Sequence, residues 1–166
     1  GNDFRNIFIV TDPTTYGTST VASDLTVRQT YASKLTGVSG TFSVDEKITQ
    51  ASTGAVGRVV EYDATNTILY FQQERYSDYG TTSTGVFALF SGANSITGAT
   101  SSAAGTPDLT ADSAVTLANS FTITFTNGYA NPELQPDSGN VIYTENISPN
   151  SRSAEQTDDF KIVVEF

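Results

Sequence analysis

The chain has 166 residues, with 18 acidic against 8 basic side chains, which gives a formal net charge of −10 at pH 7. Nucleic-acid binders need basic groups to displace phosphate counterions, so we expect no nucleic-acid partner. No apolar run approaches the ~20 residues of a membrane-spanning helix, so we expect no membrane association either.

The chain lacks the residue types on which most catalytic sites depend. With no His and no Cys, the chain cannot form a Ser-His-Asp triad, a thiol nucleophile or an imidazole–thiolate metal site. Two oxygen-based alternatives remain open: a carboxylate pair for glycoside hydrolysis, and a calcium site at Asp158 and Asp159 or at Asp108 and Asp112. These acids lack EF-hand spacing, so we interpret them as solvated loop carboxylates and expect no enzyme, no metal and no cofactor.

Alternation of apolar and polar residues predicts strands along most of the chain. In chain order the predicted strands are residues 6–10, 25–35, 41–50, 56–62, 67–73, 85–90, 120–126, 140–146 and 160–166. A short helix over residues 21–35 remains the alternative to the second strand. Residues 63–66 connect two strands and predict a hairpin with a four-residue loop. Gly, Pro, Ser and Asp predict loops at 76–84 and 131–139.

The last predicted strand ends the chain on an apolar face. Phe160, Ile162, Val164 and Phe166 share that face. A chain end normally frays unless a sheet holds it, so we expect this segment to be structural to its last residue.

Residues 42–57 and 90–105 resemble each other at an offset of 48 positions. Seven of the sixteen aligned positions are identical, among them a Phe-Ser pair, an Ile-Thr pair and a closing Gly. Each copy has the pattern of a strand followed by a turn of small residues. Such turns favour Gly and small residues in any protein, so the alternatives are a duplicated β-unit and convergent turn chemistry.

The predicted fold class is all-β, with an antiparallel β-sandwich-like core and an inserted small β subdomain. Residues 1–36 and 110–166 are predicted to form the core. Residues 37–109 are predicted to form the subdomain, with joints at Thr36-Gly37 and Pro107-Asp108.

Aromatic residues are concentrated in the middle of the chain, where we expect them to supply core and cross-strand contacts. Tyr76 and Tyr79 could instead form an exposed patch for a protein partner or a sugar ring. Arg152 lies in a polar loop and could anchor that loop or pair across an interface. Together with Gln156, these residues are the candidate interface residues.

Several short motifs together resemble a known family. The motifs are Asp3-Phe-Arg-Asn-Ile, Asp12-Pro, Phe42-Ser-Val-Asp-Glu, Gln50, Gly57-Arg-Val-Val, Val141-Ile-Tyr-Thr-Glu-Asn, Ser151-Arg-Ser, Gln156-Thr-Asp-Asp and Lys161-Ile-Val-Val-Glu-Phe. In these motifs the chain resembles the C-terminal half of a T4-like phage baseplate wedge protein, the wedge component that is dimeric in the baseplate. A partial match of this kind agrees with the absence of an initiator Met.

The resemblance implies a structural, non-enzymatic component of a contractile phage tail, located in the virion. Its partners would be other baseplate and tail proteins, and the full-length protein would be a homodimer. The alternative interpretation is a carbohydrate- or receptor-binding β module of a phage fibre or bacterial surface protein.

Overall fold

The computed structural model of the chain describes residues 5–73 and 88–147. Contacts between Cα atoms divide the chain into two compact units, one made of Gly1–Asp12 with Gly139–Phe166 and the other of Pro13–Ser138. The described residues form strands and no helix, so the predicted all-β class is confirmed.

Eleven strands follow one another along the described residues. They are β1 (Arg5–Thr11), β2 (Tyr31–Ser39), β3 (Lys47–Gln50), β4 (Val56–Asp63), β5 (Ile68–Gln73), β6 (Ile96–Gly98), β7 (Ala104–Pro107), β8 (Ala114–Thr116), β9 (Thr122–Thr124), β10 (Tyr129–Ala130) and β11 (Asn140–Ile147). Strands β1 and β11 pair with each other in the first unit, and β2 to β10 belong to the second.

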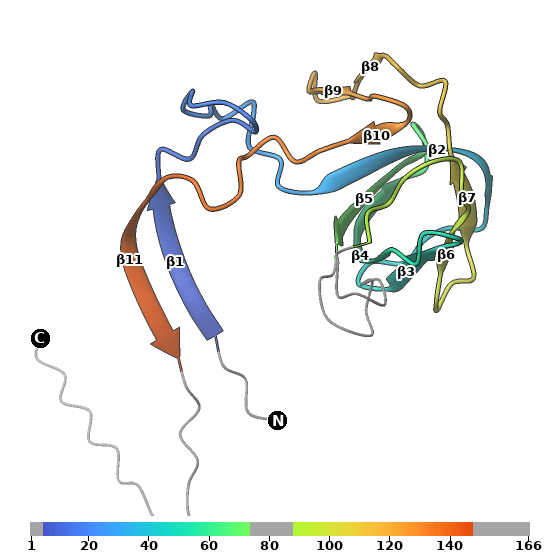
Figure 1. Ribbon diagram of the computed structural model, residues 1–166, viewed down its shortest axis with the longest axis horizontal. Coiled ribbons are helices and arrows are strands. Elements are labelled where there is room, and N and C mark those ends of the chain that lie inside the picture. The colour runs from blue at the N-terminus through green and yellow to red at the C-terminus, as the bar shows by residue number, and fades with distance from the viewer. Residues whose placement is uncertain (1–4, 74–87, 148–166) are drawn as a thin grey trace, which may run out of the picture. The chain divides into compact units, whose positions relative to one another are not determined.

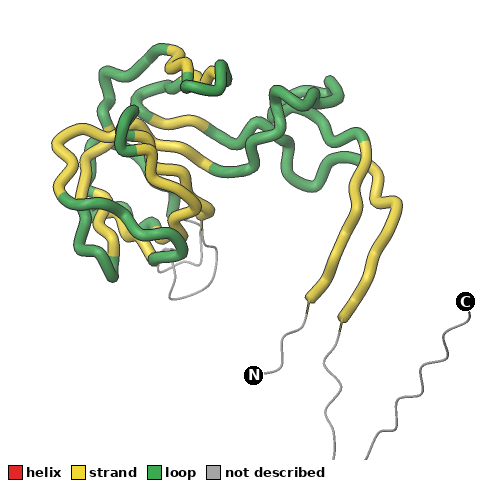
Figure 2. The backbone as a smooth tube through the Cα atoms, turned by 180° about the vertical axis from the view of Figure 1, so that it is seen from behind, coloured by secondary structure: helices red, strands yellow, loops and turns green. Residues whose placement is uncertain are grey.

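The second unit is built on a closed antiparallel barrel. Six strands form a ring in the order β2, β5, β4, β3, β6, β7, and β2 closes it by pairing with both β5 and β7 (Figure 1). Seen from behind in Figure 2, the barrel is a set of strands joined by long loops. Closure leaves no free sheet edge in the ring, whereas the sequence pattern predicts a sandwich of two layers.

Apolar side chains fill the inside of the barrel. The buried residues of this cluster are Leu35, Phe42, Ile48, Ala55, Val59, Leu69, Phe71, Ala88, Phe90, Ile96 and Ala103. Within this cluster the centroid of the Phe71 ring lies 4.6 Å from that of Phe90, and the partly buried Tyr31 ring stacks on Phe71 at 5.8 Å. The described aromatic residues in the middle of the chain therefore pack in the core of the barrel and across its strands.

A second cluster covers the outer face of the barrel wall. The hairpin β8–β9 supplies Ile123, and the following Phe125 packs with it against Ala32 on β2 and Ile68 on β5. Strands β2 and β5 are thus buried on both faces, which explains why successive residues such as Ala32 and Ser33 are both inaccessible to solvent.

The two similar sequence segments occupy equivalent positions in the barrel. Strands β3 and β6 are antiparallel neighbours, and Thr49 lies opposite Thr97, its counterpart at the offset of 48. Equivalent residues form equivalent hairpin pairs: Ile48 with Gly57, and Ile96 with Gly105. Equivalent backbone hydrogen bonds join the copies: Ala51 N to Ser95 O at 3.0 Å, and Ala99 N to Lys47 O at 2.9 Å. The two segments are therefore related by a local two-fold symmetry, and their origin as a duplicated β-unit stays a prediction.

The structure confirms some predicted strands and corrects others. The hairpin over residues 56–73 and the strands near 6–10 and 140–146 are present as β4–β5, β1 and β11. The strand predicted at 25–35 begins only at Tyr31, because Leu25 and Val27 are exposed. The strand predicted at 41–50 shortens to β3, and residues 88–90 of the one predicted at 85–90 are not in a strand. The strand predicted at 160–166 lies outside the described residues.

The compact units differ from the predicted division at 36/37 and 109/110. Strand β2 runs across the first predicted joint and pairs with β5, β7 and β10, so both sides of that joint belong to one sheet. The observed division falls instead at Asp12–Pro13 and Ser138–Gly139.

A buried carboxylate links the two similar segments. Glu46 is only 5% exposed, and its oxygens accept hydrogen bonds from Ser43 N (2.7 Å), Thr100 N (3.0 Å), Ser101 N (2.9 Å) and Ser101 Oγ (2.6 Å). Burial alone would raise the pKa of this carboxyl group, but the hydrogen bonds outweigh it and lower the pKa of Glu46. A Cβ atom at Gly98 would lie 2.5 Å from Oε1, so the site also requires glycine there.

We predict that Glu46→Gln lowers the free energy of unfolding by about 2 kcal/mol near neutral pH, because buried N–H donors lose their acceptor. The folded-state pKa is lowered, so the ionised carboxylate stabilises the fold above the ordinary carboxyl pKa. This stabilisation is lost as the pH falls through the folded-state pKa. Urea unfolding of both proteins at neutral and at acidic pH measures the effect, with the exposed Asp24→Asn as control. An unfolding difference that does not shrink in acid would contradict the assignment.

Candidate functional site

The candidate interface residues from the sequence all lie outside the described residues. Tyr76, Tyr79, Arg152 and Gln156 belong to residues 74–87 and 148–166, so their roles stay predictions. Two other features of the described residues carry the functional argument: the β1–β11 ribbon and a pocket on the outside of the barrel.

The acids considered as calcium ligands have structural partners or lie outside the described residues. Asp108 accepts hydrogen bonds from Thr110 N (3.0 Å) and Thr110 Oγ1 (2.6 Å), and Asp112 accepts one from Asn127 N (2.6 Å). Asp158 and Asp159 fall in the segment that is not described. Across residues 5–73 and 88–147, no group of three Asp, Glu, His or Cys side chains is placed to hold a metal ion.

The β1–β11 ribbon is a two-stranded antiparallel sheet (Figure 1). Apolar residues lie on both of its faces. Its large apolar side chains are between 41% and 63% exposed: Ile7, Phe8, Ile9, Val10, Val141, Ile142 and Tyr143. Ile9 lies opposite Tyr143, while Val10 lies opposite Val141 after a register shift, and adjacent residues of a strand point to opposite faces.

Such a ribbon cannot bury its own side chains. Two strands without a packed face are marginally stable in water. Burying one large apolar side chain contributes about 1.5–3 kcal/mol, so covering several of them provides a substantial driving force for association. An exposed apolar surface of this kind marks an interaction site.

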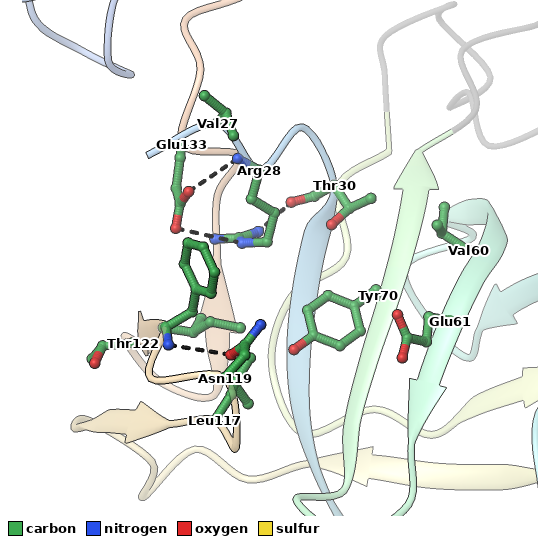
Figure 3. A pocket seen from close by; sticks show the side chains of 12 residues that line it. Val27, Arg28, Thr30, Val60, Glu61, Tyr70, Leu117, Asn119, Thr122 and Glu133 are labelled. Atoms are coloured by element: carbon green, nitrogen blue, oxygen red, sulfur yellow. Dashed lines mark hydrogen bonds and ion pairs between the residues drawn. The ribbon is translucent and has the colours of Figure 1, made fainter. Parts of the chain in front are cut away.

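The pocket lies on the outer face of the barrel, between the strands β4–β5 and the hairpin β8–β9. Its volume is about 340 Å³. Its lining residues are Val27, Arg28, Thr30, Val60, Glu61, Tyr70, Leu117, Asn119, Phe121, Thr122, Ile123 and Glu133. Figure 3 shows Tyr70 with Glu61 on one side and the Arg28–Glu133 pair and Asn119 on the other.

A β-bulge in β4 directs two successive side chains toward this pocket. Val59 lies opposite Phe71 and Glu61 lies opposite Tyr70, so Val60 is the extra residue. Val59 is buried in the barrel, whereas Val60 and Glu61 are both exposed and both line the pocket. Bulges re-aim side chains in this way and are frequent beside functional sites.

An ion pair forms one wall of the pocket. Arg28 Nε lies 3.8 Å from Glu133 Oε1, and the Arg28 backbone N–H donates to Glu133 Oε2 at 3.0 Å. The Arg28 guanidinium also donates to the carbonyls of Thr30 and Asn131, while Nε itself has no hydrogen-bond partner. Burial lowers the pKa of Arg28, and Glu133 partly offsets this effect. The guanidinium of Arg28 is therefore largely neutralised and hydrogen-bonded by residues of the protein itself, and little of it is left for a ligand.

The Tyr70 hydroxyl experiences an excess of negative charge. Burial is the main cause that raises the pKa of Tyr70 to about 12, and the carboxylates of Asp63, Glu61 and Glu133 raise it further. Arg28 opposes them and lowers it. Tyr70 consequently remains a neutral phenol that can donate or accept a hydrogen bond.

Sequence reasoning missed both features. The ribbon had a signal, since four consecutive apolar residues, Ile7 to Val10, exceed what one buried face needs. The pocket had none, because its lining residues come from five separate stretches of the chain and the bulge at Val60 does not show in the sequence pattern.

The fold and the two surface features define a small closed-barrel protein with an attached apolar ribbon. Comparison with known proteins gave no match to a protein-family model, to a curated protein or to a solved structure. Within the described part of the chain, no helix has the length and apolarity needed to cross a membrane.

We predict that Glu61→Gln lowers the pKa of Tyr70 from about 12 toward the ordinary tyrosine value, because it removes a negative charge that disfavours the phenolate. A pH titration of tyrosine ring carbon-13 signals by NMR measures this pKa, and Tyr70→Phe assigns the signal. The exposed Asp24→Asn is the control and leaves the Tyr70 pKa unchanged. An equal pKa in Glu61→Gln and in the unmodified protein would contradict the described pocket geometry.

Proposed function

We propose that this protein is a non-enzymatic structural subunit that assembles through its β1–β11 ribbon with a second copy of itself. The observation that carries the proposal is the exposure of large apolar side chains on both faces of the ribbon. A second copy would cover one of these faces by packing its own ribbon against it.

The charge distribution favours a second copy as the occupant. Two chains that each carry a net charge of −10 repel each other at long range. Residues 6–11 of β1 and 140–144 of β11 contain no charged side chain, so two copies can meet there without placing like charges in contact. The same patch on both subunits also suits a two-fold interface, in which identical surfaces face each other.

The larger assembly that we propose is a contractile phage tail baseplate, in which the chain acts as part of a wedge subunit of the virion. This part of the proposal rests on the resemblance of the sequence motifs, several of which lie in or next to the ribbon. Other baseplate and tail proteins would be its further partners. The alternative of a carbohydrate- or receptor-binding module depended on Tyr76 and Tyr79, outside the described residues, and stays a prediction.

We predict that the chain is a dimer in solution and that Phe8→Asp converts it to a monomer. A carboxylate on the apolar face would have to be buried without a partner, so we expect the dissociation constant to rise at least about a hundredfold. Size-exclusion chromatography with light scattering over a range of concentrations measures this.

The matched control is Leu25→Asp, at a side chain with exposure similar to that of Phe8 (63% against 59%) but in the barrel unit. This variant should remain a dimer. A monomeric mass for the unmodified chain at all concentrations, or equal dissociation by both variants, would overturn the proposal.

A further inference from the structure

We propose that the pocket between β4–β5 and β8–β9 binds a basic side chain, an arginine or a lysine, from a neighbouring protein of the assembly. This inference rests on the proposed assembly role, because it places the basic group on a protein partner. The site is separate in sequence from the ribbon, since all of its residues belong to the barrel unit.

The charges of the residues that line the pocket favour a cationic ligand. Two carboxylates, Glu61 and Glu133, and one guanidinium, Arg28, line the pocket. Glu133 is paired with Arg28, whose remaining donors go to backbone carbonyls. The Glu61 side chain has no hydrogen bond or ion pair with another described residue, so the lining carries one unpaired negative charge. An anionic ligand would be repelled and a cationic one attracted.

An apolar surface also lines the pocket that contains this charge. Val60, Leu117 and Ile123 supply aliphatic contacts, and the Phe121 side chain is 38% exposed. The side chains of arginine and lysine carry a cation on an aliphatic stem that packs along such surface. A ring such as that of Phe121 also attracts a cation that lies over its face.

Polar groups with unused hydrogen-bonding capacity line the pocket on both sides of the Tyr70 ring (Figure 3). The Tyr70 hydroxyl has acceptor lone pairs and faces more negative than positive groups. Asn119 Oδ1 accepts a hydrogen bond from Phe121 N at 3.2 Å, which fixes the amide at the pocket wall. The bulge at Val60 places Glu61 in register with Tyr70, so the carboxylate lies beside the Tyr70 ring, whereas the Tyr70 hydroxyl points toward the side of Asn119 (Figure 3).

An NMR titration of the intact chain with N-acetyl-arginine amide tests this inference. We expect the backbone amide signals of Val60, Glu61 and Phe121 to shift with saturation, and N-acetyl-lysine amide to act on the same signals. N-acetyl-citrulline amide has nearly the same shape without the charge and should bind at least tenfold more weakly. High salt should weaken the binding of the charged ligands.

Variants separate the pocket from general surface effects. Glu61→Gln, at an exposed position that should not affect folding, is expected to weaken arginine binding at least tenfold, whereas Asp24→Asn leaves it unchanged. Equal binding of the citrulline compound, no shifts up to the solubility limit, or stronger shifts with a neutral methyl glycoside would overturn the inference. Phe8 and the pocket residues belong to different units, so Phe8→Asp should abolish dimerisation and leave arginine binding unchanged. Loss of dimerisation and loss of arginine binding can therefore be told apart.

Discussion

Strand β2 provides the constraint on which the barrel depends. Its first half pairs with β5 and its second half with β7, so one nine-residue strand closes a ring that otherwise would be an open sheet with two free edges. Closure encloses the cluster around Phe71, and the β3–β6 pairing brings the two similar segments together. The Glu46 carboxylate then ties the turn at Ser43 to the loop at Ser101, which holds the far side of the ring.

The pocket and the β1–β11 ribbon differ in how much of their apolar surface the fold buries. Covering the outer face of β2 and β5 requires the hairpin β8–β9, and the pocket lies where that hairpin meets the bulge at Val60. The ribbon is different, because its large apolar side chains remain 41% to 63% exposed. We therefore interpret the barrel as the self-sufficient part of the chain and the ribbon as the part that needs a partner.

The sequence predicted the local features of the fold better than the long-range ones. The β4–β5 hairpin was predictable because Asp63 caps its own loop, accepting hydrogen bonds from Thr65 and Asn66. The start of β2 could not be predicted in this way. Leu25 and Val27 continue the alternating pattern, but their segment is not part of a sheet and is held by hydrogen bonds between Arg28 and Glu133. Barrel closure and the pocket depend on pairings between distant residues, such as Leu35 with Pro107, which a pattern along the chain cannot specify.

Amide hydrogen exchange can show whether a second copy covers the β1–β11 ribbon. An isolated two-stranded ribbon opens readily and exchanges its amide hydrogens fast. If a second copy covers the ribbon, the amides of Ile7, Ile9 and Tyr143 should exchange slowly at high protein concentration and faster on dilution, while those of the barrel stay constant. Fast exchange of the ribbon amides at every concentration would mean that no second copy covers the ribbon.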